Sequence, residues 1–145
     1  PPEAEGEIAL ALARRSHDKR SWWMKVTEDS DKDAETALTH YRILGRGDGL
    51  SWLELKPHTG RTHQLRVHCA AIGCPIAGDG LYGGDKAGSA ARRIQLHARA
   101  ITIPGRGDDA ALTVTAPVPR GMATLLEACG FAGEASPLQQ DHAAS

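Results

Sequence analysis

Two stretches of alternating apolar and polar residues, separated by a glycine-containing turn, predict a β-hairpin near the middle of the chain. The first, ETALTHYRILGR, covers Glu35–Arg46 and mixes β-branched and aromatic residues with polar ones, as half-buried strands do. The sequence GDG at Gly47–Gly49 favours a turn, and LSWLELKP at Leu50–Pro57 predicts the returning strand.

The same pattern recurs further along the chain, where a helical pattern follows it. IQLHARAITIP at Ile94–Pro104, the turn sequence GRGDD and ALTVTAP at Ala111–Pro117 predict a second hairpin. PRGMATLLEACG at Pro119–Gly130 predicts a helix, because proline is favoured at the start of a helix and glycine just after its end. Hairpins with interspersed helices indicate an α+β fold, with a few helices on a mainly antiparallel mixed sheet. Residues 132–145 are small and polar without periodicity, so we expect a disordered tail.

A further apolar pattern, between the two hairpins, predicts another helix. Thr59 or Thr62 could cap its first turn by accepting a hydrogen bond from a free backbone N–H. Gly73 can adopt the left-handed conformation that ends a helix, and Pro75 prevents the helix from resuming. Three apolar residues at helical spacing are expected to face the core: Leu65, Cys69 and Ile72.

This helix places basic residues where an anion is favoured. Arg61, His63 and Arg66 fall near its N-terminus, where the helix dipole and free N–H groups attract negative charge. Lys56, Arg61 and Arg66 have no acidic residue between them, so we expect a locally positive face although the net charge is −1. Arg66 could hold a carboxylate or a phosphate in bidentate fashion. A surface arginine without a special role remains the alternative.

Composition and length bound the class of protein. The chain has 145 residues, 41% of them hydrophobic and 24% charged, which fits one ordinary globular domain. No apolar run approaches the roughly 20 residues that span a bilayer, so we expect no membrane association. The three cysteines are unevenly spaced and suggest no disulfide framework, so we expect a reducing, cytoplasmic environment.

A metal site is the competing interpretation of the histidine-rich stretch. His58, His63 and His68 are five residues apart, and five residues on a helix turn by about 140° beyond a full turn, so the side chains diverge. Cys69 and Cys74 lack the two-residue spacing that is typical of zinc ligands. We therefore expect no metal, and we expect Cys69 to be a small core residue.

The segment KPHTGRTHQLRVHCAAIGCPIAGDGLYGG, at Lys56–Gly84, closely resembles the pattern of the RluA-type pseudouridine synthases. Its core TGRTHQLRVH is highly specific for that family. ARRSHDKRSWWMKV at Ala13–Val26, the strands of both predicted hairpins and LTVTAPVP resemble further family segments, so that the resemblance covers Gly6–Leu126.

The resemblance implies an RNA isomerase that converts uridine to pseudouridine, with ribosomal RNA as the expected substrate. In members of the family, an aspartate side chain reacts with the target uridine, and the reaction needs neither a metal nor a cofactor. The arginine that pairs with this aspartate corresponds to Arg66, and the residues expected to shape the RNA-binding wall are Arg61, Thr62, His63 and Gln64. Residues 1–131 then correspond to the C-terminal portion of the family's catalytic domain. We expect the protein to act as a monomer.

The chain departs from the family pattern in one respect. The catalytic aspartate of the family belongs to an HRLD motif, which these residues do not contain, so we expect it upstream of Pro1 and expect this chain to be inactive alone. Asp18, in SHDKR, matches a later loop and is not expected to be the nucleophile. Asp79 matches the GD segment, where turn formation is the better interpretation, and Tyr82 is interpreted as a packing residue at that turn.

The missing aspartate has a physical consequence and leaves other functions open. A buried arginine without its partner lowers the free energy of unfolding by about 3–5 kcal/mol, so we expect Arg66 either to loosen this chain or to turn toward water.

Two other functions remain open. A non-catalytic RNA-binding module or a truncated remnant is the alternative function, and a metal-dependent hydrolase is a third.

Overall fold

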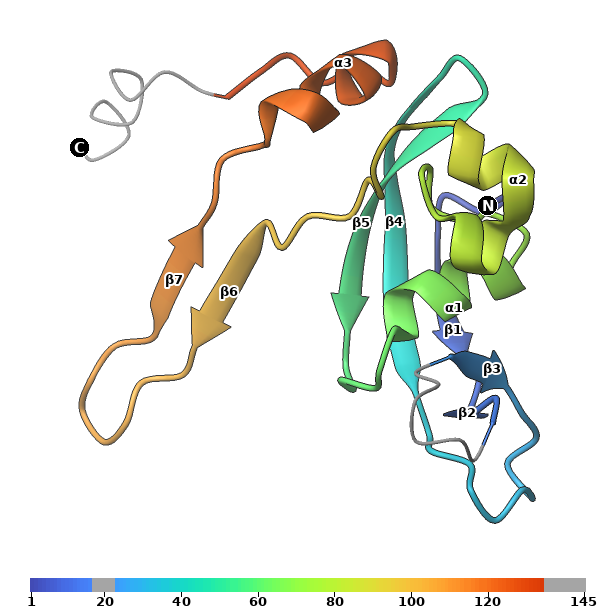
Figure 1. The fold of residues 1–145 in the computed structure, drawn as a ribbon. Helices are drawn as coiled ribbons and strands as arrows, with labels where there is room; N and C mark the ends of the chain where they lie inside the picture. The colour runs from blue at the N-terminus through green and yellow to red at the C-terminus, as the bar shows by residue number, and fades with distance from the viewer. Residues whose placement is uncertain (17–22, 135–145) are drawn as a thin grey trace. The chain divides into compact units, whose positions relative to one another are not determined.

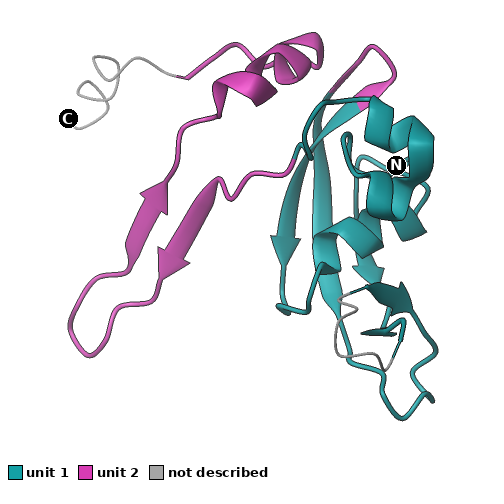
Figure 2. Ribbon diagram, viewed as in Figure 1, with its two compact units in different colours: residues 1–45, 51–95 teal, residues 46–50, 96–145 magenta. Residues whose placement is uncertain are grey.

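The computed structural model describes residues 1–16 and 23–134 of the chain (Figure 1). Two compact units are distinguished, one of residues 1–45 and 51–95 and the other of residues 46–50 and 96–145 (Figure 2). Asp18 and residues 135–145 of the expected tail lie outside the described residues. No helix in the described ranges is both long and apolar enough to cross a membrane.

The first unit is built on a three-stranded sheet of β1 (Glu5–Ala9), β4 (Leu38–Gly47) and β5 (Leu50–Pro57), in the order β1-β4-β5. β1 runs antiparallel to β4, with Ile8 opposite Thr39. The predicted hairpin is confirmed, and its two turn residues, Asp48 and Gly49, both have positive φ, as tight hairpin turns require.

β4 begins three residues later than the alternation predicts. Glu35, the predicted first residue, instead exchanges two backbone hydrogen bonds with Leu12, at 2.8 and 2.9 Å. Leu12 belongs to β2 (Leu12–Arg14), which pairs antiparallel with β3 (Met24–Val26) in a small second sheet. Strands of three residues are too short to carry a recognisable period, so the sequence did not predict them.

The predicted helix between the hairpins is α1 (Gln64–Ala71), which packs against β3 and a second helix, α2 (Gly80–Ser89). α1 ends as predicted, with Gly73 at φ 73°. The predicted threonine cap is wrong: His63 is the N-cap residue, and no side chain caps the helix. Thr59 instead donates its hydroxyl proton to Gln64 Oε1, at 2.7 Å, and accepts the Leu38 N–H.

The core of this unit includes a cluster of four buried residues, with Tyr82 packed against it: Leu12, Met24, Ala37 and Val67. Cys69 is fully buried, as predicted, and burial raises the pKa of its thiol to about 11. Leu65 and Ile72 are only half-buried, whereas the polar residues Gln64 and His68 of α1 are fully buried. The inward face of α1 is therefore partly polar, which an apolar periodicity could not reveal.

α2 was not predicted because four of its ten residues are glycine, and Gly84 has a non-helical backbone inside it. Small residues are nevertheless required there. A Cβ atom on Gly83 would lie 2.4 Å from the Ala87 Cβ and 2.6 Å from the Pro75 Cβ. The Asp79 side chain starts the helix by accepting hydrogen bonds from the Leu81 and Tyr82 N–H groups.

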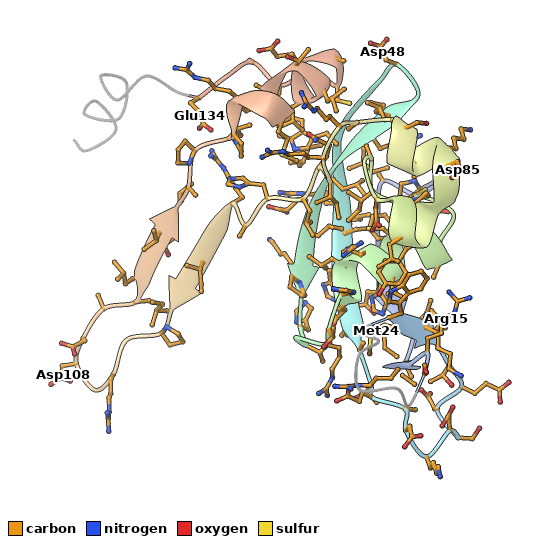
Figure 3. All side chains as sticks on the ribbon, in the orientation of Figure 1. Arg15, Met24, Asp48, Asp85, Asp108 and Glu134 are labelled. Atoms are coloured by element: carbon orange, nitrogen blue, oxygen red, sulfur yellow. The ribbon has the colours of Figure 1, made fainter. Side chains whose placement is uncertain are left out.

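The second unit contains the second hairpin, β6 (Ala100–Ile103) and β7 (Leu112–Thr115), and the predicted C-terminal helix α3 (Arg120–Ala128). β6 is shorter than predicted, since Gln95 belongs to the first unit and donates its N–H to the Ala77 carbonyl oxygen of that same unit. Figure 3 shows Asp108 at the end of the hairpin loop. The fold is of the predicted α+β class, with antiparallel sheets.

Substitution of Gly78 tests how tightly the segment before α2 is packed. Gly78 has φ +82°, and a Cβ atom there would lie 2.1 Å from the Arg93 carbonyl oxygen. We expect Gly78→Ala to lower the free energy of unfolding by about 2–5 kcal/mol, because left-handed strain of about 1–2 kcal/mol adds to overpacking of about 1–3 kcal/mol. Gly49→Ala is the control, since Gly49 has φ +74° but open space around it. Equal losses in denaturant unfolding would contradict the packing argument.

Candidate functional site

The TGRTHQLR segment forms the turn after β5 and the first half of α1, and the Gln64 side chain fixes it to β4. The Gln64 amide donates to the Leu38 carbonyl oxygen and to Thr39 Oγ1, both at 3.0 Å. Its oxygen accepts from Thr59 Oγ1 and from the Arg61 N–H. Both donors and both acceptor sites of the amide are thus used inside the protein.

Thr39 extends this network to a second buried side chain, His68. Because Thr39 Oγ1 accepts from Gln64, its own proton is available for His68 Nδ1, at 2.9 Å. His68 Nε2 lies 2.9 Å from the Leu10 carbonyl oxygen, to which it can only donate. With a proton on Nε2, His68 can donate to Leu10 and accept from Thr39, and these two contacts hold α1 to β4 and to the residue after β1.

Arg66 makes a bidentate ion pair with Asp79. Nε lies 2.9 Å from Asp79 Oδ2, and Nη2 lies 2.8 Å from Oδ1. The Asp79 side chain is 1% exposed and that of Arg66 is 22% exposed. The hydrogen bonds from Arg66 lower the pKa of Asp79, and those to Asp79 raise the pKa of Arg66, so both groups are charged at neutral pH.

This pair corrects the expectation that Arg66 lacks a partner in this chain. Asp79 forms turn contacts, as predicted, but it also supplies the compensating carboxylate, from thirteen residues further along the chain. Arg66 therefore has no uncompensated charge to loosen this unit.

His63 and Tyr82 complete the surroundings of Arg66. The Tyr82 hydroxyl accepts the Met24 N–H at 3.1 Å and lies 2.7 Å from His63 Nδ1. The Arg66 guanidinium carbon lies 5.0 Å from the centre of the Tyr82 ring. Tyr82 packs against the core, as predicted, but on α2 and not at a turn. We call these four residues, His63, Arg66, Asp79 and Tyr82, the Arg66 cluster.

His63 is held neutral and in a rare backbone conformation. Burial, with a further contribution from the Arg66 charge, lowers the pKa of His63. Neutral His63 can accept the Tyr82 hydroxyl proton at Nδ1, which leaves a donor N–H at Nε2. Its φ of 52° is unusual for a residue with a side chain, and such strain is concentrated at functional sites.

The predicted positive face is offset by acidic residues that lie elsewhere in the sequence. Arg61 Nη1 lies 3.1 Å from Glu35 Oε1, and Arg61 Nε donates to the Thr36 carbonyl oxygen. Lys56 Nζ lies 3.6 Å from Glu54 Oε2. With Arg66 paired to Asp79, each of these basic residues has an acidic partner, so the prediction of an unbalanced positive face is wrong.

The site residues that were predicted from the sequence differ in burial and in their neighbours. His63 and Arg66 share the Arg66 cluster, Gln64 is 4% exposed behind it, and Thr62 is exposed. Tyr82 and Asp79 belong to the cluster but were interpreted from the sequence as packing and turn residues. Within residues 1–16 and 23–134, no three histidine, cysteine or acidic side chains gather as metal ligands would.

Comparison with known proteins identifies the family. The family model described as RNA pseudouridylate synthase matches residues 1–71. An uncharacterized RNA pseudouridine synthase of Zymomonas mobilis is 40% identical over 126 residues, which cover 86% of this chain and 55% of that protein. The dual-specificity RNA pseudouridine synthase RluA of Yersinia pestis is 45% identical over 80 residues, which cover 54% of this chain and 37% of that protein. This chain belongs to the RluA-type pseudouridine synthase family.

A solved structure supports the same family assignment. The structure titled Human RNA Pseudouridylate Synthase Domain Containing 1 has a TM-score of 0.71 and 32% sequence identity, and the match covers 96% of this chain and 58% of that one. The chain therefore spans about half the length of the Zymomonas mobilis and human relatives that it matches.

The Thr39 hydroxyl should be essential to the buried network. Thr39→Val keeps the volume but leaves a Gln64 N–H and the His68 Nδ1 without a partner, so we expect a loss of roughly 2–4 kcal/mol in the free energy of unfolding. Thr102→Val is the control, because Thr102 bonds to Thr113 on an exposed hairpin. A loss below 1 kcal/mol for Thr39→Val in urea unfolding would show that the network contributes little.

The ion pair should make stability depend on pH in the acid range. The folded-state pKa of Asp79 is lowered, so its contribution is fully present above the unfolded value of about 3.9 and is lost as pH falls below it. We expect Asp79→Asn to lower unfolding free energy by roughly 2 kcal/mol at pH 7, and this difference should shrink below about pH 4. Asp85→Asn is the control, since Asp85 is exposed on the same helix (Figure 3). A difference that stays constant down to pH 2 would contradict the assigned pair.

Proposed function

We propose that this chain is part of an RNA pseudouridine synthase, an isomerase that converts uridine to pseudouridine in RNA. Family membership supports the reaction class, and the Arg66 cluster supports the position of the chemistry. The observation that carries the proposal is the Arg66 guanidinium, which Asp79 fixes within the TGRTHQLR segment on a side chain that is still 22% exposed. Such a guanidinium can hold a second anionic group in a set orientation.

The isomerisation requires two changes at the uridine. The glycosidic bond must break, and the uracil must turn so that its carbon 5 bonds to the ribose. In the RluA-type pattern an aspartate acts on the uridine, and we propose that its carboxylate lies against the free edge of Arg66. The 145 residues contain no HRLD sequence, so we propose that a segment outside them provides this aspartate.

The remaining motif residues have supporting roles in this proposal. Neutral His63 offers its Nε2–H to an acceptor on the RNA, and Thr62 is exposed where the RNA would pass. Gln64 shapes the same wall from behind, because all four of its hydrogen-bonding positions hold the turn in place. Arg61, paired with Glu35, would need to exchange this carboxylate for a phosphate to bind RNA.

We further propose ribosomal RNA as the substrate and action as a cytoplasmic monomer without a cofactor. Target uridines in loops are favoured, because extruding a base costs least where it is not paired. Three free cysteines in the chain agree with a reducing compartment.

Release of tritium from RNA labelled at uridine carbon 5 measures the reaction, because the new carbon bond replaces that hydrogen. For the whole natural protein that contains this chain we expect release from ribosomal RNA. Arg66→Ala should lower kcat by about 100- to 1000-fold, the usual effect of removing one preorganised charged donor. Arg66→Lys should also lose most activity, since an ammonium cannot form the bidentate geometry.

Arg106→Ala is the control for this experiment, because Arg106 is exposed in the β6–β7 loop. Its kcat should stay within twofold of the wild type. Activity of Arg66→Ala above one tenth of the wild type would refute the assigned role. Salt-dependent RNA binding without tritium release by the wild type would instead favour a non-catalytic RNA-binding module.

A further inference from the structure

The Asp79 carboxylate is held more rigidly than turn formation alone requires. Oδ1 accepts the Leu81 and Tyr82 N–H groups as well as Arg66 Nη2, and Oδ2 accepts Arg66 Nε. Gly78, directly before it, has left-handed backbone and no space for a side chain. Backbone groups of two segments therefore fix the carboxylate, which in turn fixes the guanidinium.

Arg66 is restrained by Asp79 on one edge and by contact with Tyr82. Nε and one N–H of Nη2 point at Asp79, and the guanidinium carbon lies over the Tyr82 ring, 5.0 Å from its centre. Within the described residues, the hydrogen bonds of the Arg66 side chain are the two to Asp79. The adjacent edge, which consists of Nη1 and the second N–H of Nη2, has no hydrogen-bond partner among the described residues, and its geometry matches two carboxylate oxygens.

We propose that Asp79 is a positioning residue for the isomerisation: it orients the free edge of Arg66 toward the reacting carboxylate. This inference rests on the proposed function and deepens it, because it assigns a role in the reaction to a residue whose sequence context indicates a turn. Asp79 acts through Arg66 and does not touch the substrate.

The negative charge of Asp79 also affects which anions Arg66 attracts. Because Arg66 and Asp79 together carry no net charge, the incoming carboxylate is recognised by oriented N–H groups more than by an isolated cation. Removal of the Asp79 charge would leave a cation that attracts any RNA phosphate. The loss of Asp79 should therefore weaken the chemical step without weakening RNA binding.

Asp79→Asn separates the turn from the positioning role. Asparagine keeps an oxygen that can accept the Leu81 and Tyr82 N–H groups, but it has one acceptor oxygen and no charge for Arg66. In the whole natural protein, measured well below its melting temperature, we expect kcat to fall on the order of 100-fold, as for a misplaced catalytic group. KM for RNA should stay equal or decrease, and the plot of log affinity against log salt should steepen by about 0.7–0.9.

Two control variants separate a loss of orientation from a loss of surface charge or of stability. Asp85→Asn makes the same change on an exposed position of α2 and should leave kcat within twofold. Ile8→Val removes a buried methylene group from β1, away from the hydrogen bonds of the Arg66 cluster, and should lower stability without lowering kcat. A fall in kcat for Asp79→Asn alone then reports orientation and not a general loss of stability.

The outcomes distinguish this inference from the proposed function. An active wild type whose Asp79→Asn variant keeps kcat within twofold overturns the positioning role and leaves the proposed function standing. A variant with unchanged kcat but raised KM overturns it as well, because Asp79 would then serve RNA binding. A wild-type protein that releases no tritium from any ribosomal RNA overturns both.

Discussion

The ion pair between Arg66 and Asp79 is the contact on which the site depends, because it joins the middle of α1 to the first residue before α2. Both ends of the pair are restrained by other groups, Arg66 by the Tyr82 ring and Asp79 by the backbone of α2. A buried ion pair is weak evidence for stability, since desolvation offsets much of the attraction. Its clear consequence is geometric, since it fixes one guanidinium in one orientation.

Buried polar groups give the rest of the site its precision. Gln64, Thr39 and His68 form one hydrogen-bonded chain of buried side chains. A fully satisfied network of this kind specifies a single arrangement, because any shift leaves a buried group without a partner. The TGRTHQLRVH segment thus joins two buried side chains, Gln64 and His68, to two more exposed ones, His63 and Arg66.

The apolar core cluster and the polar site of the first unit share one residue, Tyr82. Leu12, Met24, Ala37 and Val67 form the buried cluster. Tyr82 belongs to both systems, since its ring packs on this cluster while its hydroxyl connects Met24 to His63. A change in the core near Tyr82 would therefore alter the site as well as the stability.

The sequence by itself determined the local elements and the family. Alternation predicted β4 and β5, the Asp-Gly turn between them and helix α3, because these features depend on residues that are close in the chain. The TGRTHQLRVH motif identified Arg66 as the important arginine.

Tertiary structure alone decided which residues are partners: Asp79 for Arg66, Glu35 for Arg61 and Thr39 for His68. The two residues of these pairs are 13, 26 and 29 positions apart in the sequence, respectively, and only the folded backbone sets the distance between such groups. The glycine-rich α2 was hidden for the same reason, because close packing against Pro75 and the Asp79 cap stabilise a helix that its own propensity disfavours.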